Sequence, residues 1–138
     1  MKFIYYSLLF LLASCGPSVT VTRAIIDKSS LASTFVRSPD PLQKNTPNGE
    51  RLFISWTLPL TLKPENHYLV LSVIYKDLSE EKKIYPIHNR YGTTTFDLLD
   101  DNFKDHNGFY AYQAELQDTE GKVIDKWEHQ MWVSILNP

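Results

Sequence analysis

Few polar side chains in this sequence have the spacing that catalysis requires. The nearest match is Ser79-Glu80-Glu81-Lys82, which has the Ser-x-x-Lys pattern of enzymes with a serine nucleophile. That pattern works from a helix end with further serine and lysine partners, whereas residues 79–82 form a short charged stretch. We therefore interpret them as a solvated turn. The sequence motifs of α/β hydrolases, zinc proteases and P-loop proteins do not occur.

The potential metal ligands are scattered. The histidines are His67, His88, His106 and His129, and no two have the short spacing of a zinc motif. Residues 97–107 are acidic and could offer oxygen ligands to calcium, but Phe103 occupies a position where an EF-hand loop beginning at Asp101 has a ligand. We expect ordinary Asx-turns in this loop and no cofactor.

The strongest signal is at the start of the chain. Lys2 supplies a positive charge, and residues 3–12 are apolar except for Ser7, a length that suits a signal peptide and is too short to cross a bilayer as a helix. Small residues follow, and then Cys15. It is the sole cysteine, so the chain cannot form an internal disulfide.

The segment Leu12-Ala13-Ser14-Cys15 resembles the lipobox of bacterial lipoproteins, although Ser14 stands where glycine or alanine is commoner. The resemblance implies that residues 1–14 are a signal peptide removed in front of Cys15, whose thiol then carries lipid. Each buried methylene of such an anchor contributes about 0.8 kcal/mol. Gly16 in place of aspartate favours the outer membrane in a cell that has one. The alternative is an ordinary secretory signal beside a free cysteine.

Composition limits the partners. The 138 residues are 43% hydrophobic and 22% charged, which is typical of one globular domain. Removal of residues 1–14 takes away Lys2 and leaves 13 basic and 16 acidic residues, a formal net charge of −3. The densest basic site, Lys82-Lys83, is neutralised by Glu80-Glu81. We therefore exclude a nucleic-acid partner.

The remaining chain has the alternation of β-strands. Residues 15–36 suggest a lipidated cysteine and tether with a possible edge strand, and residues 37–138 a β-sandwich domain. Leu52, Ile54, Trp56 and Leu58 share one face of the strand expected at 51–58. Residues 67–75 are apolar on both faces and predict a central strand. Pro86 lacks the donor that a sheet requires, so residues 82–88 belong at a sheet edge or a bulge. Residues 93–99 predict a further strand, followed by a polar loop to Gly108.

The last two strands form an expected hairpin. Tyr110, Tyr112, Ala114 and Leu116 would share a face of residues 109–117, and residues 123–135 would alternate through Trp127, Met131 and Val133. Gly121 suits the left-handed position after a type I turn in Asp118-Thr119-Glu120-Gly121. No segment has a sustained helical period. Six or seven strands predict a single antiparallel, all-β sandwich or barrel.

Residues 52–59, Leu-Phe-Ile-Ser-Trp-Thr-Leu-Pro, resemble the second strand of fibronectin type III and related immunoglobulin-like domains. Residues 68–75 would be the third strand, and Tyr110-Ala111-Tyr112 resembles the penultimate strand with its packed tyrosine. The resemblance spans residues 37–135 and implies a core role for Trp56. The stretch from Leu99 to Phe109 is longer than that family's corner usually allows. This fold has many functions, so it implies a scaffold only.

The function is expected to be binding. Trp127 and Trp132 are five residues apart, which places them on opposite faces of an ideal strand, and either could contact a partner. We predict a non-enzymatic interaction or assembly module of the cell envelope. Its partners would be the membrane, through lipid on Cys15, and another envelope protein, with no small-molecule substrate evident. One alternative is a glycan-binding sandwich using Tyr75, Tyr85 and Tyr91. An envelope enzyme is the third hypothesis.

Overall fold

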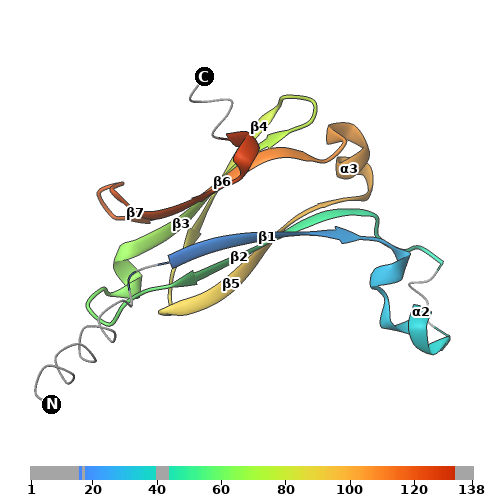
Figure 1. Cartoon of the computed structure of the whole chain (residues 1–138), viewed down its shortest axis with the longest axis horizontal. Helices are drawn as coiled ribbons and strands as arrows, with labels where there is room; N and C mark the ends of the chain where they lie inside the picture. Colours follow the sequence, from blue (N-terminus) through green and yellow to red (C-terminus); the bar gives the residue numbers. More distant parts are fainter. Residues whose placement is uncertain (1–15, 17, 40–43, 133–138) are drawn as a thin grey trace, which may run out of the picture.

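Two antiparallel sheets packed face to face form the molecule (Figure 1). The computed structural model describes residues 16, 18–39 and 44–132. Within these residues the first sheet has the order β1-β2-β5 and the second β4-β3-β6-β7. The strands of the first sheet are β1 Ser18–Ile26, β2 Gly49–Thr57 and β5 Tyr91–Leu99. Those of the second are β3 His67–Tyr75, β4 Glu80–Pro86, β6 Phe109–Asp118 and β7 Val123–Glu128. The predicted all-β sandwich is confirmed.

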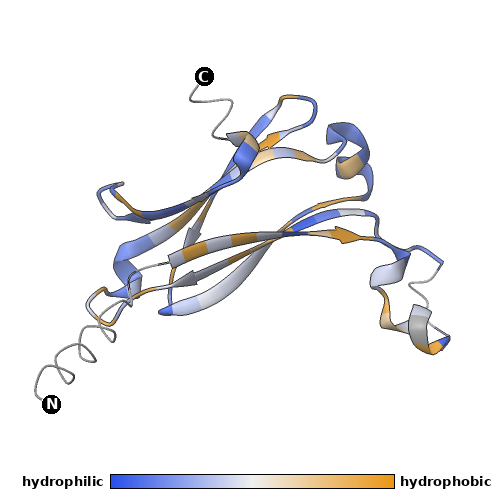
Figure 2. Ribbon diagram, viewed as in Figure 1, coloured by the Kyte–Doolittle hydropathy of each residue, from blue (hydrophilic) through white to orange (hydrophobic). Residues whose placement is uncertain are grey.

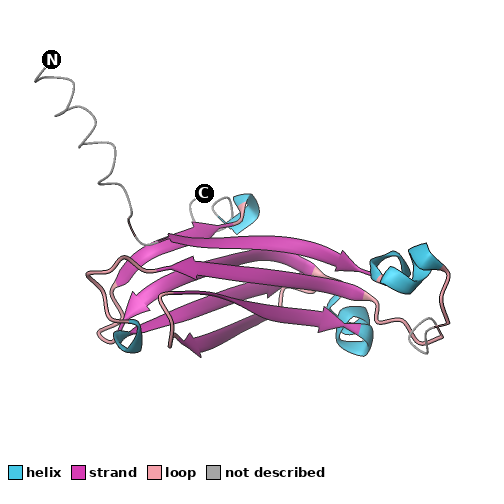
Figure 3. Ribbon diagram, turned by 90° about the horizontal axis from the view of Figure 1, so that it is seen from below, coloured by secondary structure: helices cyan, strands magenta, loops and turns pink. Residues whose placement is uncertain are grey.

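Short helices connect some of the strands. The α-helices are α2 Ala32–Val36 and α3 Asp100–His106, and the 3-10 helices are η1 Lys28–Ser30 and η3 Pro64–Asn66. Both α-helices lie at the same end of the sandwich, which we call the helical end (Figures 1 and 3). Strand β1 starts at the opposite end, which we call the β1-start end. The loop of residues 58–66 and the β6–β7 turn also lie there.

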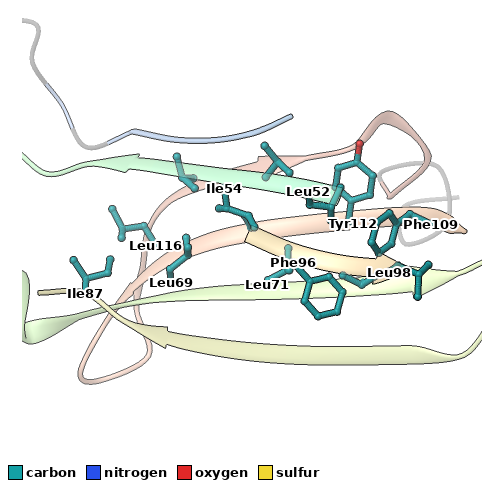
Figure 4. Close-up of a cluster of buried hydrophobic side chains, with 14 of the residues drawn as sticks. Leu52, Ile54, Leu69, Leu71, Ile87, Phe96, Leu98, Phe109, Tyr112 and Leu116 are labelled. Carbon is teal, nitrogen blue, oxygen red and sulfur yellow. The ribbon is translucent and has the colours of Figure 1, made fainter. Parts of the chain in front are cut away.

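The core lies between the sheets and follows the predicted alternation of β2. Leu52, Ile54 and Leu58 are buried, whereas Trp56 is half-buried at the margin of the core. Side chains from both sheets meet these residues (Figure 4), among them Leu69, Leu71, Phe96, Leu98, Phe109 and Leu116. β3 is central and β4 is an edge strand, as the apolar run and Pro86 predict.

Strand β1 is part of the sandwich. It pairs with β2 along its whole length, from Ser18 opposite Thr57 to Ile26 opposite Gly49. Hydrophobic and polar residues alternate over its first five residues (Figure 2), and Val19 and Val21 are buried in the core. The possible edge strand suggested for residues 15–36 is thus a full strand, and the first sheet begins at Ser18.

A bulge changes the phase of β6. Ile74 pairs with Ala111 but the next residue, Tyr75, pairs with Phe109, which leaves Tyr110 as an extra residue. Tyr112, Ala114 and Leu116 face the core as predicted, but Tyr110 does not. Tyr110 packs on the outer face of the sheet instead, while Phe109 is buried in the core. The alternation predicted from 110 onward is wrong at its first residue because of this bulge.

The β6–β7 turn has the predicted form. The amide of Gly121 donates to the carbonyl of Asp118 at 3.0 Å, and Gly121 has a φ of +81°. The chain after it departs from the prediction, because β7 ends at Glu128 and residues 130–132 form a helical turn. The predicted alternation through Met131 is therefore wrong. Val133 and Ile135 lie outside the described residues.

The polar loop expected between residues 99 and 108 contains a helix. α3 has Asp100 and Asp101 in its first turn and Lys104 and His106 in its last, a charge order that suits the helix dipole. Asn107 ends it in the left-handed conformation. Seven residues are too few to reveal a helical period in the sequence, so the expectation of Asx-turns was wrong here.

Candidate interaction surfaces

The expected lipidation site, Cys15, lies outside the described residues. Three residues later Ser18 begins β1, so the described sandwich starts close to it in the chain. Of the helices that the described residues form, none has the length and apolar character needed to span a membrane.

Trp127 faces the interior of the sandwich from the β7 edge of the second sheet. It lies opposite Ala114 on β6 and is half-buried against the core. Its ring stacks on Tyr112 with the centroids 5.5 Å apart and an interplanar angle of 13°, and Tyr112 also packs on His129 at 4.7 Å. Burial, and then the positive charge of Arg23, lower the pKa of His129. These three rings pack together on the inner face of the second sheet, at its β7 edge.

The same edge is tied to the first sheet. The backbone amide of Val19 on β1 donates to Asp125 Oδ2 on β7 at 2.8 Å. This bond uses a donor at the free edge of β1, which would otherwise be open to another strand. Trp127 therefore lies where the two sheets are joined.

Trp132 lies on the outer face of the second sheet. The helical turn after β7, in which the amide of Trp132 donates to the His129 carbonyl at 2.8 Å, brings the indole onto Ile74 and Ala111. It is 9% exposed. The indole forms one wall of a hollow of about 430 Å³, whose other sides include Ser72, Glu80 and Lys82. Trp127 and Trp132 thus lie on opposite faces of the sheet, although the chain leaves the strand between them.

A polar cluster that the sequence did not reveal joins the β3–β4 turn to α3. Asp77 Oδ2 lies 2.8 Å from His106 Nδ1, which is also 3.1 Å from Ser79 Oγ. Ser79 donates its hydroxyl to Asp77 Oδ1 at 2.5 Å. The ring of Tyr75 stacks on His106 at 4.2 Å. His106 is 27 residues from Ser79, so no local spacing could have indicated the contact.

This cluster differs from a nucleophile activated by a base. In a Ser-His-Asp triad the carboxylate and the serine bind different nitrogens of the histidine. Here Asp77 and Ser79 approach the same nitrogen, and the Ser79 hydroxyl is committed to Asp77. The hydrogen bonds from Ser79 lower the pKa of Asp77 to about 2. Burial, and then the hydrogen bond to Glu81, raise the pKa of Tyr75. The geometry fits a turn fastened to α3.

A small cavity of about 280 Å³ lies beside this cluster. Its lining includes Tyr75, Glu81, Lys83, Asp97 and His106. Lys83 Nζ pairs with Glu81 Oε1 at 2.9 Å. The Asp97 carboxylate accepts hydrogen bonds from Nε and Nη2 of Arg51 at 2.6 and 2.7 Å. Glu81, Lys83 and Asp97 therefore each have a partner of opposite charge.

The tyrosines considered for glycan binding do not form one exposed surface. Tyr75 is 3% exposed and Tyr85 is half-buried against the core, whereas Tyr91 is 77% exposed. A sugar-binding platform needs aromatic faces that are open to solvent, and only Tyr91 provides one. The structure therefore offers no aromatic platform at these three positions.

Three of the acidic residues of the 97–107 segment, Asp97, Asp100 and Asp101, bind groups within the protein. Asp100 Oδ1 accepts from the Asn48 amide at 3.1 Å, and Asp101 pairs with Lys104 at 2.8 Å. Among the residues that the structure describes, no three histidine, cysteine or acidic side chains are grouped so that they could hold a metal ion.

Comparison with known proteins adds no relative. No family model matches the sequence, and neither the curated proteins nor the solved structures give a match.

Proposed function

We propose that this chain is a lipid-anchored protein of the bacterial cell envelope that acts as a non-enzymatic protein-interaction module. The observation that carries the proposal is the sole cysteine, Cys15, at the end of a short apolar segment in the pattern of a lipobox. A sandwich tethered in this way is held at the membrane while its faces stay available to other proteins.

We further propose that the sandwich is of the fibronectin type III or immunoglobulin-like kind. The order of its strands supports this assignment. The first, second and fifth strands form one sheet, and the third, sixth and seventh lie side by side in the other. Immunoglobulin domains group strands A, B and E against C, F and G in the same way. The fourth strand extends the second sheet, the sheet to which variable-type immunoglobulin domains add their extra strands.

Metabolic labelling with palmitate in a bacterial host tests the anchor. We expect Cys15→Ser to abolish incorporation of label and to leave the precursor uncut, because lipid must join the thiol before the signal peptide is removed. Ser14→Ala is the matched control, since alanine is common at that position of a lipobox and should leave labelling intact. Label retained in Cys15→Ser would show that the anchor assignment is wrong.

We propose the hollow beside Trp132 as the partner surface. Its volume of about 430 Å³ is within the range of pockets that accept a side chain or small ligand. The indole supplies an apolar wall held in place by Ile74 and Ala111, while Glu80 and Lys82 supply a charged rim. An apolar centre with a polar rim suits a reversible protein contact.

Photocrosslinking in intact cells tests this surface. A photoreactive residue at Lys82, which is exposed and borders the hollow, should give adducts with an envelope protein. The matched control is Thr95, an exposed strand residue of the other sheet. Equal adducts at the two positions, or none at Lys82, would exclude the hollow as the contact.

A further inference from the structure

The most exposed large apolar side chains at the β1-start end of the sandwich are Leu60 and Tyr91. Leu60 is 85% exposed in the loop after β2, and Tyr91 is 77% exposed at the first position of β5. Figure 2 shows the hydrophobic colouring of this loop beside the start of β1. Turn positions usually carry glycine, proline or small polar residues, so an exposed leucine at such a site suggests a contact.

Hydrogen bonds hold Leu60 in position. The amide of Leu62 donates to the Pro59 carbonyl at 3.1 Å, which closes a turn with Leu60 at its tip. Arg90 Nη1 donates to the carbonyls of Pro59 and Leu62 at 2.7 and 2.8 Å. The amide of Leu58 donates to the Arg90 carbonyl at 2.6 Å. The loop is therefore rigid before contact, and a contact through Leu60 costs little conformational entropy.

The chain leading to Cys15 begins beside these residues. Ser18 pairs with Thr57, which in turn pairs with Tyr91, so the three lie side by side on adjacent strands. With strands about 4.8 Å apart, Ser18 and Tyr91 are about 10 Å apart. Cys15 precedes Ser18 by three residues, which span about 10 Å at most. Lipid on Cys15 must therefore lie within a short distance of this end.

The β1-start end carries no excess of negative charge. The loops of the β1-start end balance Lys63, Arg90 and Lys122 against Glu65, Asp118 and Glu120. At the helical end, α3 is acidic, whereas the segment that contains η1 and α2 carries Lys28 and Arg37 against Asp27. A neutral end is free to approach anionic lipid, and the acidic α3 is not attracted to it.

On these grounds, and resting on the lipid anchor proposed above, we infer that the β1-start end sits on the bilayer, with Leu60 and Tyr91 in contact with its surface. Tyrosine is favoured at the level of lipid headgroups, where its ring is apolar and its hydroxyl is wet. The strands of nine residues are about 30 Å long, so the helical end then points away from the membrane.

Site-directed spin labelling of the lipidated protein tests the orientation. Leu60→Cys is compared with Leu78→Cys, which replaces another leucine that is 71% exposed, in the β3–β4 turn of the helical end. The lipid thioether on Cys15 keeps that sulfur from reacting with the label. Each full-length protein, confirmed as lipidated by mass spectrometry, is reconstituted in vesicles of phosphatidylethanolamine and phosphatidylglycerol. Collision rates with oxygen and with a water-soluble nickel complex are then measured.

We expect the ratio of oxygen to nickel accessibility to be at least threefold higher at position 60 than at position 78, because oxygen partitions into lipid and the nickel complex does not. Equal ratios in lipidated protein would overturn this orientation while leaving the anchor intact. A protein without lipid on Cys15 would overturn the anchor and the orientation together. Because the vesicles contain no other protein, a partner protein cannot account for a difference between the two accessibility ratios.

Discussion

The indole of Trp56 lies against Gly92 on the neighbouring strand. The two residues are paired across β2 and β5, and a Cβ on residue 92 would lie 2.5 Å from indole carbon Cζ2 and 2.8 Å from Cη2. The indole Nε1 also donates to the Asn89 carbonyl at 3.1 Å. The absence of a side chain at position 92 is therefore what lets the indole cover the margin of the core.

We predict that Gly92→Ala lowers the free energy of unfolding by about 1–3 kcal/mol, the usual cost of overpacking. The added methyl must displace the Trp56 ring and weaken its hydrogen bond to Asn89. Urea unfolding measures the change. The same substitution should cost less in a Trp56→Phe background, because the smaller ring lacks the atoms that clash.

Thr95→Ala serves as the control, since it alters an exposed residue of the same strand and should change stability by no more than about 0.5 kcal/mol. An equal cost of Gly92→Ala with either Trp56 or Phe at position 56 would show that the contact with the indole is not its cause.

Local patterns in the sequence predicted most of the strands of the sandwich. The alternation of Leu52 and Ile54 gave the buried face of β2, and Pro86 gave an edge strand because proline lacks a donor for the sheet. Gly121 gave the turn of the last hairpin. Each of these features depends on residues close in sequence, so it is visible without the fold.

Contacts between distant residues were not predictable in the same way. The bulge at Tyr110 follows from pairing with β3, and it reverses which of the first residues of β6 face the core. Trp132 reaches the outer face because the chain turns after Glu128. The cluster of Asp77, Ser79 and His106 joins two elements that only tertiary packing brings together. Periodicity carries no information on such contacts.

The second prediction concerns the ion pair between Arg23 and the buried Glu50. Glu50 is buried; it pairs with Arg23 through Oε1 and accepts the Phe109 amide through Oε2 at 2.9 Å. We expect Arg23→Ala to lower the free energy of unfolding by about 1–3 kcal/mol, because the carboxylate loses its cation; fully buried pairs cost more, and the Arg23 side chain is one-third exposed.

The control is the partly exposed pair of Arg51 and Asp97 in the same sheet, with bonds of 2.6 and 2.7 Å. Arg51→Ala should cost no more than about 1 kcal/mol, because solvent screens this pair. Denaturant unfolding of both variants gives the comparison. If Arg23→Ala lowers the free energy of unfolding by no more than Arg51→Ala does, the burial of Glu50 does not strengthen its ion pair.

The third prediction concerns pH. The Ser79 hydroxyl and amide hydrogen bonds hold the pKa of Asp77 at about 2, below the ordinary 3.8. A carboxyl with a depressed folded pKa stabilises the protein above about pH 4, and this contribution is lost as the pH falls towards 2. Ser79→Ala removes the hydroxyl donor and should raise the pKa of Asp77 towards 3.8.

An NMR titration of the side-chain carboxyl carbons measures this change. Asp101, whose pKa is lowered by Lys104, is an internal reference in the same spectra because it does not depend on Ser79. An unchanged titration of Asp77 in Ser79→Ala would mean that the serine hydroxyl does not set its pKa.

The last prediction concerns the turn between β6 and β7. Asp118 Oδ1 accepts the amides of Glu120 and Lys122, both at 2.9 Å, and Gly121 follows with a φ of +81°. A Cβ at position 121 would meet nothing within 4 Å, so any cost of a side chain there comes from the backbone alone.

We expect Gly121→Val to lower the free energy of unfolding by about 1–2 kcal/mol, because a β-branched residue disfavours positive φ. Gly121→Asn should cost less, since asparagine tolerates this conformation. Thermal unfolding of the two variants measures the difference, and equal losses of stability would contradict the backbone explanation.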